Sequence, residues 1–149
     1  MELELFCLLL LLEKENDILI FIVVCRKIKY QNKEVGNMNY FCTEQERKIS
    51  HSTCYLEFQK GIYKGECWLS DSISLHIDVF DRLKLYKLFR KAIPEFDYYG
   101  ITEVNENQWV ILKELSLEQG EEVQKVIEEL SIWVSDCFKT EKIFTIWGI

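Results

Sequence analysis

The sequence lacks the signatures of most enzymes. It contains no glycine-rich phosphate loop, no GxSxG or HExxH motif and no CxxC pair, so nothing indicates nucleotide binding, serine hydrolysis or a zinc site. Two histidines leave little material for acid–base or metal chemistry. One proline and six glycines leave little room for long flexible linkers. We therefore expect a protein with no catalytic residues, no metal and no cofactor.

The chain also lacks a positive balance of charge. Its formal net charge is −7. Nucleic acids and anionic membrane surfaces are bound through clusters of lysine and arginine. We therefore expect neither as a partner, whereas an acidic protein can steer a basic one toward itself.

An export signal is missing from the start of the sequence. The apolar run Leu5–Leu12 follows Glu2 and Glu4, where a signal peptide would be basic, and no small-residue cleavage site comes after it. The next apolar run, Ile18–Cys25, is equally short, and charged residues separate the two, so neither is long enough to cross a membrane. We expect a soluble cytoplasmic protein with free thiols at its six cysteines, positions 7, 25, 42, 54, 67 and 137.

The pattern of apolar residues predicts one α+β domain over residues 1–149, with a largely antiparallel sheet of about five to seven strands. Two helices are expected beside the sheet, 81–93 and 117–138. Strand pairs are expected at 3–12 with 18–30, before a loop at 31–37, and at 53–58 with 62–69, turning near Lys60. Further strands are expected at 72–80, 108–112 and 143–147.

Capping residues and apolar spacing support the two helices. Asp81 is a plausible N-cap for the first, and Pro94 ends it. Ser116 and Gln119 match a capping box for the second. Its buried face is expected to carry residues at helical spacing: Val123, Ile127, Leu130, Val134 and Cys137.

Two residue pairs could carry chemistry. His51 and Cys54 form an H-x-x-C pair, but a metal site needs three or four ligands. His76 and Asp78 share one face of the predicted strand 72–80, and such a pair could orient an imidazole. A surface loop and a hydrogen-bonded strand face are the simpler interpretations.

The distribution of acidic residues is more informative. Residues 94–136 contain eleven acids and two lysines, a net charge of −9, so the rest of the chain carries +2. Within this stretch, the segment 96–100 places three aromatic residues and an acid in a predicted loop. Aromatic anchors beside carboxylates are typical of protein interfaces. The predicted partner-binding residues are Glu95, Asp97, Tyr98, Tyr99, Glu103 and Glu106.

The stretch FDYYGITEVNENQWVILKEL, residues 96–115, resembles the immunity proteins that neutralise bacterial toxins, as does the general character of a small acidic domain without catalytic motifs. The resemblance implies an inhibitor that occludes a cognate, often basic, toxin such as a nuclease. Two other functions remain open: a small ligand-binding or enzymatic domain around His51, Cys54, His76 and Asp78, and a non-catalytic adaptor of a larger assembly.

Overall fold

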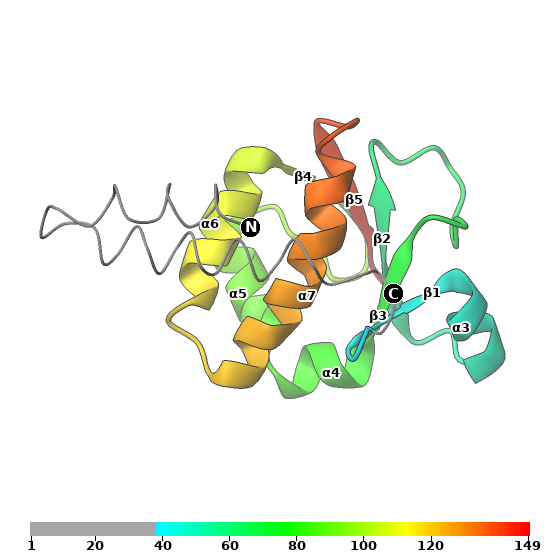
Figure 1. Cartoon of the computed structure of the whole chain (residues 1–149), viewed down its shortest axis with the longest axis horizontal. Helices are drawn as coiled ribbons and strands as arrows, with labels where there is room; N and C mark the ends of the chain where they lie inside the picture. The colour runs from blue at the N-terminus through cyan, green and yellow to red at the C-terminus, as the bar shows by residue number, and fades with distance from the viewer. Residues whose placement is uncertain (1–37) are drawn as a thin grey trace, which may run out of the picture. The chain divides into compact units, whose positions relative to one another are not determined.

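A computed structural model describes residues 38–149, and the chain divides into two units, Met1–Asn37 and Met38–Ile149. The second unit is shown in colour in Figure 1. The strand pair predicted at 3–12 and 18–30, and the loop at 31–37, lie outside the described residues. The prediction of a single domain over 1–149 therefore stays a prediction.

A five-stranded antiparallel sheet forms the centre of the described unit. Its strands are β1 (Phe41–Thr43), β2 (Tyr55–Lys60), β3 (Ile73–His76), β4 (Ile101–Asn105) and β5 (Ile143–Trp147). They lie in the order β1-β3-β2-β5-β4. This confirms the α+β class, the antiparallel sheet and the final strand at 143–147.

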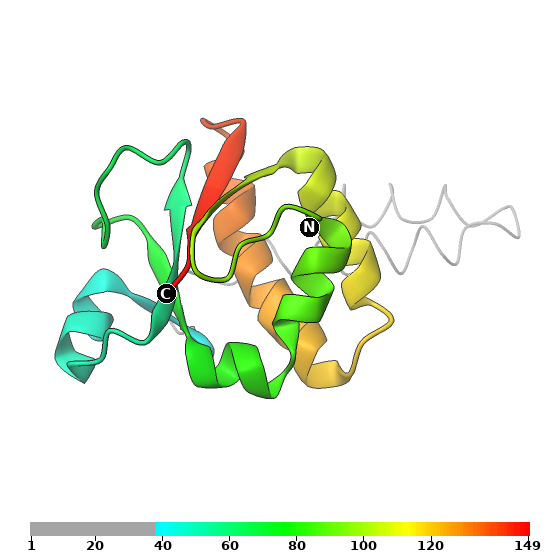
Figure 2. The ribbon, with the colours of Figure 1, turned by 180° about the vertical axis from the view of Figure 1, so that it is seen from behind.

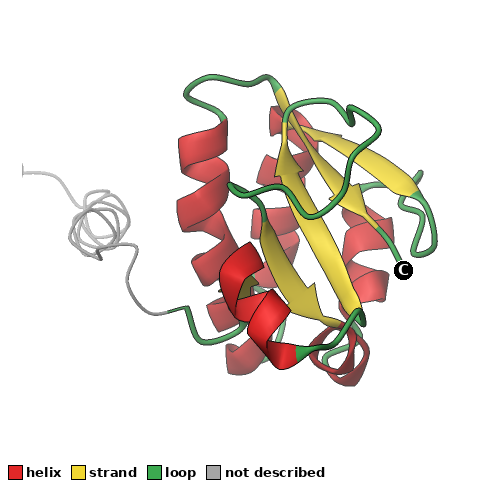
Figure 3. Cartoon of the chain, turned by 90° about the vertical axis from the view of Figure 1, so that its right-hand side faces the viewer, coloured by secondary structure: helices red, strands yellow, loops and turns green. Residues whose placement is uncertain are grey.

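Five helices accompany the sheet in this part of the chain: α3 (Glu44–Ser50), α4 (Ile77–Arg82), α5 (Leu85–Ala92), α6 (Glu106–Ser116) and α7 (Glu121–Cys137). Helices α5, α6 and α7 cover one face of the sheet, as Figures 1 and 2 show. Helix α3 lies on the other side, in front of the strands in Figure 3.

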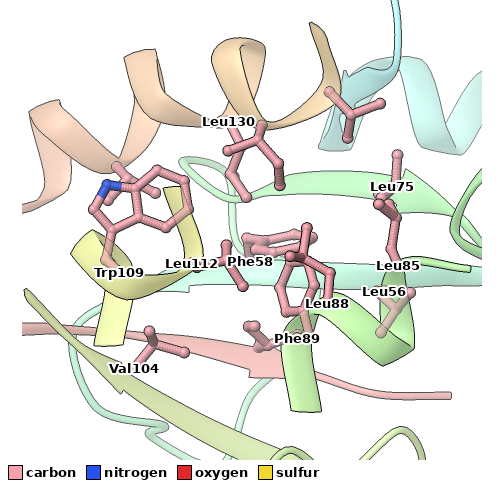
Figure 4. Packing of buried hydrophobic residues seen from close by; sticks show 14 of the residues in the cluster. Leu56, Phe58, Leu75, Leu85, Leu88, Phe89, Val104, Trp109, Leu112 and Leu130 are labelled. Atoms are coloured by element: carbon pink, nitrogen blue, oxygen red, sulfur yellow. The ribbon is translucent and has the colours of Figure 1, made fainter. Parts of the chain in front are cut away.

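The hydrophobic core lies between the sheet and helices α5–α7. In Figure 4, Leu130 of α7 points toward Phe58 of β2, and both side chains are fully buried. The residues predicted for the inner face of the last helix are all buried, which confirms that part of the interpretation: Val123, Ile127, Leu130, Val134 and Cys137. Burying large side chains of this kind stabilises the fold by about 1.5–3 kcal/mol each.

The hairpin predicted at 53–58 and 62–69 is wrong in its second half. Strand β2 pairs with β3 and β5 instead. Residues 62–69 run as an irregular loop in which Trp68 has a positive φ of 61°. The buried Glu57 carboxylate accepts hydrogen bonds from the backbone N–H of Trp68 (2.7 Å) and of Leu69 (2.9 Å). These two hydrogen bonds hold the loop in place, and residues 62–69 do not pair with β2 as a strand.

The strand predicted at 72–80 is shorter than expected, and two helices, α4 and α5, stand in place of the single helix predicted at 81–93. The strand ends at His76, whose side chain caps α4, so Asp81 lies inside that helix and is not an N-cap. Lys84, at φ 53°, separates α4 from α5. Pro94 follows the end of α5, as expected.

The strand predicted at 108–112 is also wrong, because those residues belong to α6. Asn105 and Gln108 form a capping box there that outweighs the β-branched Val110 and Ile111. The capping box predicted at Ser116 and Gln119 does not form, and α7 begins after Gly120.

Candidate functional site

The aromatic segment predicted at 96–100 lies in the loop that connects α5 to β4, residues 93–100, which we call the aromatic loop. It opens with a turn in which the N–H of Phe96 donates to the carbonyl of Ile93 (2.9 Å). Phe96 is only 4% exposed, and its ring centroid lies 5.4 Å from that of Phe89 and 5.9 Å from that of Phe80. Phe96 is therefore a core residue that anchors the loop.

The two tyrosines of the loop differ in their surroundings. Tyr98 is half-buried against Phe80, and its hydroxyl donates to the Asp81 carboxylate at 3.0 and 3.1 Å. Burial, with this carboxylate beside it, raises the pKa of Tyr98 to about 12, so the phenol stays protonated at neutral pH. Tyr99 is 77% exposed, with its ring centroid 4.9 Å from that of Tyr98.

Asp97 holds the tip of the loop. Its Oδ1 accepts the N–H of Tyr99 (2.9 Å), while its own N–H donates to Thr102 Oγ1 (2.9 Å). A Cβ atom at Gly100 would force the Asp97 carboxylate out of this position.

The last two residues of the chain secure the other side of the loop. The N–H of Gly148 donates to the carbonyl of Gly100 (2.7 Å), and that of Ile149 to the carbonyl of Tyr98 (3.1 Å). A Cβ atom at Gly148 would collide with the Tyr98 carbonyl. The loop is thus preorganised, which lowers the entropy that binding would cost.

An open groove of about 610 Å³ runs along the loop. Four of the predicted partner-binding residues line it: Glu95, Asp97, Tyr98 and Tyr99. The groove is also lined by three residues that no sequence pattern indicated: Asp81, Tyr86 and Arg90. Tyr86 and Arg90 lie four residues apart on α5, a spacing that could have placed them on one face.

The other two predicted residues lie outside the lining of the groove. Glu103 is exposed on β4. Glu106 opens α6, where a negative charge complements the helix dipole, so it has a structural reason to be acidic. Glu95 is connected to the same helix end, because the side-chain amide of Gln108 donates to its carboxylate.

Three of the remaining acids of 94–136 are bonded to other parts of the described chain. Glu122 pairs with Arg82 (2.7 Å) and Asp136 with Lys60 (2.7 Å), and these hydrogen bonds lower the pKa of both carboxyl groups. Glu129 accepts three consecutive backbone N–H groups, those of Asn39, Tyr40 and Phe41, each at 2.9 Å. These three acids therefore have an internal structural role.

The two pairs considered for chemistry also have local roles. His76 Nδ1 accepts the N–H of Asp78 (3.2 Å) as the cap of α4, and its ring stacks edge-on against Tyr55 at 4.8 Å. His51 ends α3 in a left-handed conformation, and Cys54 is exposed. Within residues 38–149, no three histidine, cysteine or carboxylate side chains are grouped to hold a metal ion.

A comparison of this chain with protein-family models, curated proteins and solved structures finds no significant match. Among the helices of residues 38–149, none combines the length and the apolar character needed to cross a membrane.

Proposed function

We propose that this chain is a protein inhibitor that binds a basic partner through the aromatic loop and its groove, as an immunity protein binds its toxin. One observation carries the proposal: Tyr99 is 77% exposed on a loop whose other residues are fixed by hydrogen bonds and core packing. Tyrosines presented on rigid supports are typical centres of protein interfaces.

The charges around the groove support a basic partner. Among residues 38–149, Asp81, Glu95 and Asp97 line it against a single cation, Arg90, and the exposed Glu103 and Glu106 follow in the chain. Carboxylates arranged in this way speed the approach of a positive surface and fix its orientation. Inhibition would occur by occlusion, with the carboxylates taking the place of phosphates if the partner is a nuclease.

The experiment measures binding kinetics at two salt concentrations with a partner recovered by pull-down. We expect the triple variant Asp97→Asn, Glu103→Gln, Glu106→Gln to associate about tenfold more slowly at low salt, with a weaker dependence on salt. Glu114→Gln, Glu118→Gln, Glu128→Gln changes the net charge equally away from the loop and serves as the control. Equal association rates for the two triple variants would contradict the proposal.

The tyrosine anchor is tested by dissociation. Tyr99→Ala should speed dissociation at least tenfold, because a buried anchor acts after the first encounter. Leu117→Ala, which also removes an exposed apolar side chain, should leave dissociation unchanged. A partner that the wild-type chain does not inhibit would instead favour the adaptor function.

A further inference from the structure

The two edges of the sheet differ in whether their outward N–H groups are occupied. Edge strand β1 has only three residues. The N–H of Phe41 donates to the Glu129 carboxylate (2.9 Å) and that of Thr43 to the Glu46 carboxylate (2.7 Å). This edge offers no free donor at these two positions to another strand, and natural sheets commonly protect an edge in such ways.

Edge strand β4 is longer, and its pairing shows which groups face outward. The bond from Gly148 N–H to the Gly100 carbonyl marks a hydrogen-bonded pair next to β4. Because such pairs alternate along an antiparallel ladder, Thr102 and Val104 bond to β5, while Ile101, Glu103 and Asn105 direct their backbone groups away from the sheet.

Within the described part of the chain, two of these three outward positions on β4 have no hydrogen-bond partner. The N–H of Asn105 donates to Gln108 Oε1 (3.0 Å) within the capping box of α6. The backbone N–H groups of Ile101 and Glu103 have no hydrogen-bond partner within residues 38–149. The edge therefore presents two donors and two acceptors at the spacing that an added strand requires.

We propose that the free edge of β4 binds an extended segment of a basic protein as an additional strand, with a lysine or arginine opposite Glu103. This inference rests on the proposed function and adds the mode of binding to it. Main-chain hydrogen bonds to Ile101 and Glu103 would supply affinity, and the charge of Glu103 would supply selectivity.

Position along the chain supports the same occupant. The aromatic loop leads directly into β4, so Tyr99 stands two residues before Ile101. Asp97 and Glu106 flank the strand with further exposed carboxylates. A basic segment lying along β4 would thus meet negative charge at both ends.

A second copy of the chain fits this edge less well. In the antiparallel register centred on Glu103, two carboxylates would face each other, which is destabilising. In the register centred on Thr102, each Glu103 would face Ile101 of the other copy, and its charge would stay uncompensated. Both copies also carry a net charge of −7.

The test uses the full chain and two synthetic peptides, one of alternating lysine and valine and one of alternating glutamate and valine. Backbone amide exchange is followed by NMR. In the free protein, the amides of Ile101 and Glu103 should exchange faster than those of Thr102 and Val104. Saturating lysine peptide should slow the first two at least tenfold, and the glutamate peptide should bind at least tenfold more weakly.

Two variants separate the main-chain contribution from the charge. Ile101→Pro removes an outward N–H without touching the bonds to β5 and should weaken lysine-peptide binding at least tenfold. Glu103→Gln, which keeps the backbone intact, should reduce the preference between the two peptides to less than threefold. Glu114→Gln on α6 is the matched control and should leave that preference unchanged.

The proposal is overturned if the lysine peptide does not slow the Ile101 and Glu103 amides, or if both peptides bind equally. Since strand addition depends mainly on backbone contacts, a peptide of this simple sequence is a sufficient probe. If the edge fails this test while Tyr99→Ala still speeds dissociation of the recovered partner, the groove remains the binding site and only strand addition is lost.

Discussion

At the centre of the sheet, around β2, both faces are buried but have opposite chemistry. The face under helices α5–α7 is apolar, with Leu56 and Phe58 of β2 among its fully buried residues. The alternate residues of the same strand, Glu57 and Gln59, are 0% and 1% exposed on the other face. Ser74 and Thr145 from neighbouring strands are buried with them: Ser74 pairs with Glu57 and Thr145 with Gln59. Burial alone therefore does not identify the apolar core in this protein.

Several groups of the polar face are bonded by the segments that cover it, whereas Gln59 Oε1 and Ser74 Oγ have no hydrogen-bond partner within residues 38–149. Gln59 donates to the carbonyl of Glu66 (2.9 Å), and Thr145 to that of Gly61 (2.7 Å). From α3, the Arg47 guanidinium pairs with the buried Glu44 (2.7 Å) and lies 3.9 Å from the centre of the Trp68 ring. A buried polar network is tolerated when its members are paired, and it is sensitive to the loss of any one of them.

The largest effect should come from breaking the buried ion pair of this polar face. Arg47→Ala leaves the buried Glu44 carboxylate with only the longer contact to the exposed Lys48 (3.5 Å) and should cost about 3–5 kcal/mol in unfolding free energy. The double variant Glu44→Leu, Arg47→Met removes both charges and should recover most of that loss. Urea unfolding measures both variants. If the double variant is no more stable than Arg47→Ala, the polar face depends on packing and not on charge pairing.

The apolar face should respond through cavity formation. Leu130→Ala should cost about 2–5 kcal/mol, because the fully buried side chain leaves a void beside Phe58. Glu128→Ala, exposed on the same helix, should cost less than about 0.5 kcal/mol. Thermal and urea unfolding test both. Similar costs for the two substitutions would mean that α7 is turned differently against the sheet.

Acid should weaken the polar face selectively. Hydrogen bonds from Arg47 lower the pKa of Glu44. The stability that comes from this lowering is complete above the ordinary glutamate pKa of about 4.3 and is lost as the pH falls through the lowered value. Wild-type unfolding free energy should therefore fall more steeply below pH 4 than that of the Glu44→Leu, Arg47→Met variant. Parallel pH profiles would contradict this assignment.

The smallest perturbation is thiol labelling, which compares a surface loop with the apolar core without mutation. Cys54 is exposed, while Cys137 is buried under the apolar face, and burial raises the pKa of the Cys137 thiol. Disulfide-exchange reagents should modify Cys54 first and Cys137 last. After denaturation without reductant, all six cysteines should be alkylated. A stable disulfide in the denatured chain would overturn both the free-thiol and the cytoplasmic predictions.

Sequence patterns predicted the parts of the fold that depend on local periodicity. The burial of α7, the end of α5 before Pro94 and strand β5 follow from apolar spacing and from the backbone geometry of proline. Where a side-chain cap competes with propensity, the prediction failed. His76 ended a strand that its alternating pattern would have continued, and the Asn105–Gln108 capping box turned a β-branched segment into α6.

For the candidate site, the sequence by itself determined the aromatic and acidic composition of residues 95–99, and so their suitability for an interface. Only the tertiary structure decided that Phe96 and Tyr98 turn toward Phe80 while Tyr99 remains exposed, and that Asp81, Tyr86 and Arg90 join them. It also decided which edge of the sheet keeps backbone N–H groups without a partner among residues 38–149. The physical reason is that these outcomes depend on contacts between residues far apart in the chain, such as Glu129 with Phe41 and Gly148 with Gly100, which no local pattern records.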